Sequence, residues 1–278
     1  MNAVQSLDRR TRVLVLACFF LSGATGLVYQ GIWFRHLQAL FGVTTHALAV
    51  VVAAFMGGLA AGSWALGRTA DRSARPLRLY GWLELGVAVL APLVPFVIRG
   101  VEALYVALHP HLAGSFVLLS LVRLGLALGT LLVPTFLMGG TLPALVVLLR
   151  RDAAARGQSS ALHRSLGRLY GLNTLGAVAG TVLVGFVLLA HLGLWRTTAV
   201  AALVNLGLGA WCVWRGGRLG PGPAAAARSV SDVTAGSGAS DAALLRFAAL
   251  AFAVSGALSL GYEVAWTRVL AQVIGSST

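Results

Sequence analysis

The chain has 278 residues, of which 58% are hydrophobic and only 10% are charged, and its mean hydropathy is +0.85. A soluble domain carries about 25% charged residues, so this composition excludes an ordinary water-soluble domain and indicates contact with lipid. The net charge of +13 comes entirely from Arg, because the chain has no Lys. These arginines cluster between apolar stretches and do not form one basic face, which argues against a nucleic-acid partner.

Seven apolar stretches are long enough to cross a bilayer, which takes about 20 residues. In chain order they are Val13–Phe34, His46–Leu66, Leu79–Ile98, Phe116–Leu149, Leu169–Ala190, Thr197–Trp214 and about Phe247–Ile274. The long fourth stretch could be one tilted, protruding helix or a kinked one, for which Pro134 and Pro143 supply kink sites. The segment 215–245 is rich in Gly, Pro, Ala and Ser, and it predicts a flexible cytoplasmic linker. The expected domains are therefore a six-helix bundle over 1–214, this linker, and a further helix within 246–278.

The arginines also predict the orientation of the bundle. With the N-terminus in the cytoplasm, 16 arginines fall in cytoplasmic segments and 4 in external ones. That distribution obeys the positive-inside rule. It holds only if Phe116–Leu149 is a single helix, because a second crossing there would invert every later loop. We therefore expect a multi-pass protein of the inner membrane with a cytoplasmic N-terminus.

An internal repeat links the first and last apolar stretches. Leu21–Thr45 aligns without gaps on Val254–Thr278, and ten of the 25 positions are identical. The identities include the shared pattern S-G-A-x(4)-Y-x(3)-W-x-R. Parallel repeats of helical halves are a known transporter architecture. The last helix is therefore predicted to be the first helix of a second, truncated repeat.

Ionisable groups inside a membrane span are costly and usually face a cavity or a partner. The candidates for a polar, substrate-binding cavity are Glu84, Arg123, Glu263, Gln30 and Asn173. Glu84 or Glu263 could attract a small cation there. The alternative is a purely structural role, in which a buried Glu–Arg pair or interhelical hydrogen bonds hold the bundle together.

A second set of residues is expected to serve packing or conformational change. Tyr29 and Trp33 lie one turn apart on one helix face, and the repeat duplicates them, so a packing or hinge role is as plausible as ligand binding. The charges between the second and third stretches could latch two bundles together. The full set is Tyr29, Trp33, Arg35, Tyr262, Trp266, Arg268, Asp71, Arg72 and Arg75.

No catalytic, metal-binding or cofactor-binding residues are predicted. His109 and His111 share a loop but lack a third ligand at suitable spacing. The glycine pairs Gly58/Gly62, Gly125/Gly129 and Gly176/Gly180 are spaced for close helix packing and not for phosphate binding.

Several motifs together resemble the membrane portion of bacterial proteins in which a major-facilitator-like bundle is fused to a spermidine-synthase domain. They are Ser22–Arg35, Phe55–Ser63, Arg75–Glu84, Pro134–Pro143 and Leu169–Ala177. The sequence departs from that family at Gln30, where Glu is usual, and at Ala74, where major facilitators usually have Gly. Glu263 keeps the acid in the second copy.

The resemblance implies an all-α, polytopic membrane protein containing a major-facilitator-like six-helix half and the first helix of a second, parallel repeat. It also implies a cytosolic polyamine aminopropyltransferase-like domain that this chain lacks, so no catalytic residue can be carried over. The leading hypothesis is an N-terminal module that anchors such an enzyme and passes polyamine-type substrate or product to it. The alternatives are half of a major-facilitator-type transporter for a small cation, and a purely structural anchor.

Overall fold

The computed structural model describes residues 6–220, apart from 43–44, 113 and 158, and residues 239–274. Every regular element in these ranges is a helix. The elements are α1 (Arg9–Phe41), α2 (Thr45–Arg72), α3 (Pro76–Leu90), the 3-10 turn η1 (Ala91–Leu93), α4 (Val94–Leu112), α5 (Phe116–Ala155), α6 (Ser159–Leu183), the π turn η2 (Val184–Leu188), α7 (Leu189–Arg218) and α9 (Ala239–Ile274). Six long apolar helices in the described chain could each cross a membrane. The expected all-α, multi-pass fold is confirmed.

Three of the predicted spans have informative boundaries. Phe116–Ala155 is one continuous helix despite Pro134 and Pro143, as the arginine distribution required. The fifth and sixth predicted spans belong to one apolar segment, Arg164–Arg218. That segment departs from helical geometry at Gly193, where φ is 69° and ψ is −179°. Glycine adopts a positive φ without steric strain, so the chain can change direction there. Helix α6 packs on α1, whereas α7 packs on α3.

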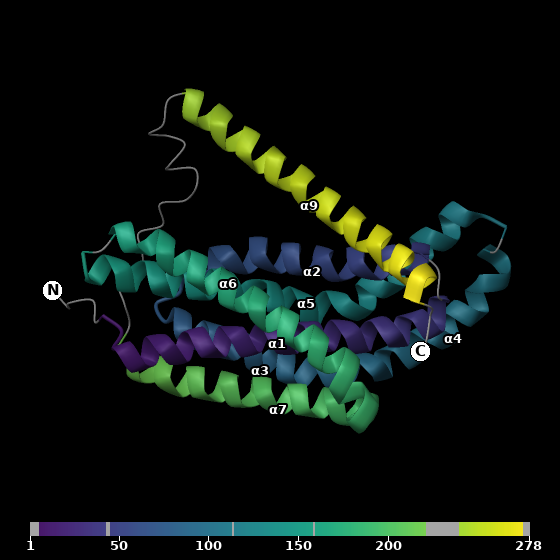
Figure 1. Ribbon diagram of the computed structural model, residues 1–278, viewed down its shortest axis with the longest axis horizontal. Helices are drawn as coiled ribbons and strands as arrows, with labels where there is room; N and C mark the ends of the chain where they lie inside the picture. The colour runs from purple at the N-terminus through teal and green to yellow at the C-terminus, as the bar shows by residue number, and fades with distance from the viewer. Residues whose placement is uncertain (1–5, 43–44, 113, 158, 221–238, 275–278) are drawn as a thin grey trace.

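Helices distant in sequence pair along the bundle: α1 with α6, α2 with α5, and α3 with α7 (Figure 1). Two clusters of buried apolar side chains fill the interior. One surrounds Tyr29 and Trp33, and the other surrounds Phe19 and Tyr80.

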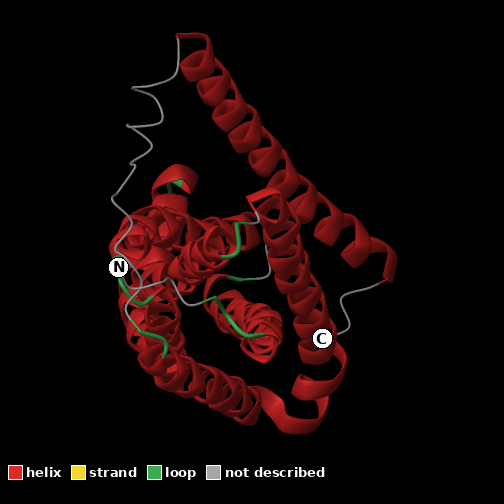
Figure 2. Cartoon of the chain, turned by 90° about the vertical axis from the view of Figure 1, so that its left-hand side faces the viewer, coloured by secondary structure: helices red, strands yellow, loops and turns green. Residues whose placement is uncertain are grey.

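One end of the bundle, which we call the arginine-rich end, holds the start of α1, the α2–α3 and α5–α6 connections and the end of α7. Ion pairs between these segments place them together, including Arg12–Asp152 and Arg150–Asp71. Figure 2 views the molecule from this side. Trp64 and Trp214 also lie at this end, and the guanidinium groups of Arg68 and Arg218 cover their rings. Aromatic and basic side chains typically collect where a bundle leaves the hydrocarbon region.

Helices α7 and α9 both extend into the predicted linker segment 215–245. Helix α7 continues to Arg218 and α9 begins at Ala239, whereas residues 221–238 lie outside the described residues. Helix α9 is set apart from the bundle and contacts mainly α2 (Figures 1 and 2). Its large apolar side chains are exposed.

Close backbone approach at glycine holds the helix pairs together. A Cβ atom on Gly62 would collide with the backbone carbonyl of Phe136 in α5, and one on Gly176 would collide with that of Phe20 in α1. Small residues at such contacts let helices pack where lipid supplies no hydrophobic drive for association. The expectation fails for Gly125 and Gly129, because a Cβ at either position would meet nothing within 4 Å.

This difference between glycines gives a paired prediction. Gly62→Ala should lower the melting temperature of the purified protein in detergent, because α2 and α5 would have to separate. Gly125→Ala is the matched control and should leave the melting temperature unchanged or raise it, since Ala is favoured over Gly within a helix by about 1 kcal/mol. An unchanged melting temperature for Gly62→Ala would contradict this account of helix pairing.

Candidate functional site

A cavity of about 260 Å³ lies inside the bundle, where α1, α2, α3, α5, α6 and α7 converge. Its polar lining residues are Ser22, Ser63, Glu84, Thr141, Asn173 and Asn205. The apolar lining includes Phe19, which belongs to one buried cluster, and Phe55, which belongs to the other. The cavity therefore joins the two halves of the core.

Glu84 is the acidic residue of this lining, and it is only 1% exposed. Its Oε1 accepts a hydrogen bond of 2.6 Å from the Ser22 hydroxyl of α1. Its Oε2 accepts a hydrogen bond of 2.8 Å from Asn205 Nδ2 of α7. Both donors are neutral, and none of the ion pairs among the described residues involves Glu84. The carboxyl group is thus hydrogen-bonded to neutral side chains, and it has no cationic partner in the described part of the chain.

The structure brings only part of the predicted candidate set to this cavity. Glu84 and Asn173 line it, whereas Gln30, Arg123 and Glu263 do not. Arg123 Nε and an Arg123 terminal amino group instead donate to the Tyr105 hydroxyl at 3.0 and 2.8 Å. Glu263 is exposed on α9. A Glu84–Arg123 pair, which the structural alternative allowed, is therefore not formed.

Ser22 and Asn205 are partners of Glu84 that the candidate set omits. Ser22 had a signal in the sequence, because it belongs to the repeated S-G-A pattern. Asn205 stands out only as a polar residue within an apolar span. Its role depends on the pairing of α3 with α7, which composition and hydropathy do not reveal.

The duplicated aromatic residues have different surroundings in the two copies. In α1, Tyr29 stacks on Trp33 with ring centroids 5.4 Å apart, and both side chains are fully buried. In α9, Tyr262 and Trp266 are 65% and 60% exposed.

The paired arginines of the repeat and the α2–α3 charges complete the predicted set. Arg35 is exposed at the end of α1, whereas the side chain of Arg268 lies outside the described residues. Asp71 pairs with Arg150 of α5, and both side chains are about half exposed. Arg72 and Arg75 have no ion pair among the described residues. The predicted packing and conformational roles of these residues remain predictions.

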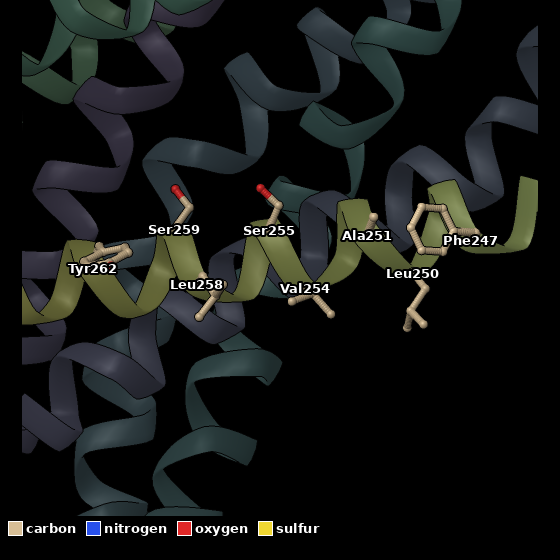
Figure 3. Close-up of a pocket in the computed structure, with 8 residues that line it drawn as sticks. All are labelled: Phe247, Leu250, Ala251, Val254, Ser255, Leu258, Ser259 and Tyr262. Carbon is tan, nitrogen blue, oxygen red and sulfur yellow. The ribbon is translucent and has the colours of Figure 1, made fainter. Parts of the chain in front are cut away.

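A second, open hollow runs along α9 (Figure 3). Its lining residues, which include Ser255, Ser259 and Tyr262, all come from that one helix. Neither Glu263 nor any other charged side chain lines it, so it offers no counterpart of the Glu84 site.

At the arginine-rich end, a buried carboxylate ties the start of the chain to α5. Asp152 is 7% exposed and accepts a 2.7 Å hydrogen bond from the backbone N–H of Leu7. It also pairs with Arg156, the residue just after the end of α5, and with Arg12 of α1, whose Nε lies 3.4 Å away. Nearby, Arg215 of α7 pairs with Asp8. The pKa of Asp8 is lowered, chiefly by a hydrogen bond from Thr11 and also by the Arg215 charge.

Fold and site together define a multi-pass helical membrane protein with a carboxylate enclosed in its bundle. The chain is 31% identical over 199 residues to the polyamine aminopropyltransferases of two Mycobacterium tuberculosis strains and of Mycobacterium bovis. The matched region is 71% of this chain and 34% of each relative, so the chain spans about a third of the length of the curated relatives it matches. This membrane portion is homologous to part of those proteins. No family model and no solved structure matches the chain.

Asp152 and Asp71, both at the arginine-rich end, should differ in how much each contributes to the stability of the fold. Asp152→Ala would leave Arg12 and Arg156 without their buried counterion and the Leu7 N–H without its acceptor. Arg12 and Arg156 are 34% and 23% exposed, so the main cost is the lost acceptor of the buried Leu7 N–H, about 1–3 kcal/mol. The melting temperature in detergent should fall clearly. Asp71→Ala removes an exposed pair, worth about 1 kcal/mol or less, and serves as the control. Equal melting temperatures for the two variants would contradict the assigned role of Asp152.

Proposed function

We propose that this chain is the membrane module of a spermidine-synthase-like protein. In this proposal it anchors a cytosolic aminopropyltransferase-like domain and holds an amine cation, the substrate or product of that domain, in the Glu84 cavity. The similarity to part of the mycobacterial polyamine aminopropyltransferases supports the first half of the proposal. Those relatives are named for polyamine chemistry, and polyamines carry the positive charge that the cavity lacks.

The observation that carries the proposal is that the buried Glu84 carboxyl has no cationic partner among the described residues. A buried ionised carboxylate is normally paired with a cation or a metal, yet the described residues around Glu84 supply neutral hydrogen-bond donors, Ser22 and Asn205 among them, and no cation. A carboxylate that only held helices together would gain nothing from facing a cavity. A bound cation would supply the missing counterion.

The remaining parts of the proposal concern topology. We propose that the arginine-rich end faces the cytoplasm of a bacterial cell, since basic segments are retained on that side of the inner membrane. The N-terminus would then be cytoplasmic. We also propose that α9 begins a second repeat after a flexible linker, on the strength of the aligned S-G-A, Tyr, Trp and Arg positions.

A second candidate is one half of a major-facilitator-type transporter that moves a small cation by alternating access. The repeat and the enclosed carboxylate favour it, because parallel repeats with central binding sites recur among transporters. Uptake of labelled putrescine into vesicles distinguishes the two proposals. Uptake that requires the protein and Glu84 supports transport, whereas binding without uptake supports the module.

Neutralising Glu84 should abolish the proposed amine binding. The purified chain should bind labelled putrescine or spermidine in equilibrium binding assays, and Glu84→Gln should weaken binding by more than about tenfold, or 1.4 kcal/mol. Gln preserves the size of the side chain but removes its charge. Glu102→Gln, at an exposed position on α4, is the matched control and should bind as the unaltered chain does. Equal binding by Glu84→Gln would refute the proposed site.

A further inference from the structure

The cavity contains a buried hydrogen-bond acceptor that has no donor. Asn205 is 2% exposed, and its Nδ2 is engaged by Glu84. Its Oδ1 is buried and has no hydrogen-bond partner among the described residues. Buried amide oxygens are almost always hydrogen-bonded, so an exception calls for an explanation. This one lies on a side chain that lines the cavity, which points to a donor supplied by a ligand.

The donor that reaches Asn205 should also carry a positive charge. The same lining holds Glu84, a carboxyl group that has no cationic partner among the described residues. The carboxylate has received hydrogen bonds from Ser22 and Asn205 but no counterion. A primary ammonium satisfies both requirements, since it combines one positive charge with three N–H donors. A quaternary ammonium supplies the charge but has no N–H for the Asn205 oxygen.

The described residues offer no second carboxylate for another ammonium of the same ligand. Asp8, Asp71 and Asp152 are paired with arginines at the arginine-rich end. Glu102 and Glu263 are exposed on α4 and α9 and do not line the cavity. A second charge placed in the lining would therefore have only neutral side chains around it, and an unpaired charge in such surroundings is strongly disfavoured.

The rest of the lining suits an alkyl chain. Leu27, Leu59, Met138 and Leu142 join Phe19 and Phe55 around the carboxylate. The volume of about 260 Å³ falls just below the range of about 300–1,000 Å³ that is typical of drug-sized ligands. The cavity thus fits a short aliphatic group carried on a charged head.

We infer that the Glu84 cavity is a site for one primary ammonium group at the end of a short alkyl chain, held by the Glu84 carboxylate and the Asn205 amide oxygen. This inference rests on the proposed amine site and narrows its ligand. A diamine binds through one end only, and its second ammonium adds nothing to affinity. Recognition therefore depends on one charge and its N–H groups, and not on the number of charges in a polyamine.

Competition binding with the purified chain tests this inference. Unlabelled butylamine, putrescine, spermidine and tetramethylammonium would each displace labelled putrescine. Butylamine should displace it at a concentration no higher than that of unlabelled putrescine, and spermidine should do no better than butylamine. Tetramethylammonium should need a concentration about tenfold higher or more, equivalent to about one lost hydrogen bond to a charged donor.

Asn205→Ala provides a second measurement. In this variant, butylamine and tetramethylammonium should displace labelled putrescine at more similar concentrations, because the amide oxygen that distinguishes them is gone. If this variant does not fold, the comparison of the four ligands on the unaltered chain still tests whether the cavity binds a single primary ammonium.

The possible failures are distinguishable. Putrescine or spermidine binding about tenfold more tightly than butylamine would overturn the single-ammonium site but leave the proposed function standing. Tetramethylammonium binding as tightly as butylamine would overturn recognition through N–H groups. If the unaltered chain binds none of the four ligands, the proposed amine site itself fails.

Discussion

Close backbone contact at glycine is the constraint on which the rest of the bundle depends. In lipid, apolar side chains gain little by meeting one another, so helices associate where their backbones can approach. Gly62 and Gly176 provide such positions between α2 and α5 and between α1 and α6. Gly81 and Gly209 do the same between α3 and α7, since a Cβ on either would crowd the backbone of the other helix. These contacts fix which faces of the helices meet.

The position of Glu84 follows from those contacts. Because α3 packs closely against α7, the Asn205 amide reaches the carboxylate from one side, and α1 brings the Ser22 hydroxyl from another. Neither neighbour balances the charge. The same packing thus leaves a carboxyl group that lines the cavity without a cationic partner among the described residues. Two hydrogen bonds between helices, from Ser22 and from Asn205, hold the Glu84 carboxyl in its place at the cavity.

Hydropathy and arginine distribution could predict the helices, because both depend on how far each residue lies from the membrane surface. That is why α5 could be predicted as one helix despite Pro134 and Pro143. The contacts of the site depend instead on the rotation of each helix and on its partner, which neither signal contains. Glu84 and Asn173 line the cavity, whereas Arg123 donates hydrogen bonds to Tyr105. The glycine spacing likewise could not show that Gly62 packs against the backbone of another helix whereas Gly125 does not.

The sequence-distant pairing of the helices has a consequence for biogenesis. Helix α1 leaves the ribosome long before α6, and α3 long before α7, so the glycine faces of the earlier helices and the Glu84 side chain enter the membrane before their partners exist. Membrane insertion and final assembly must therefore be separate stages for this chain. During the interval, Glu84 lacks the hydrogen bond that Asn205 of α7 donates to it in the assembled bundle.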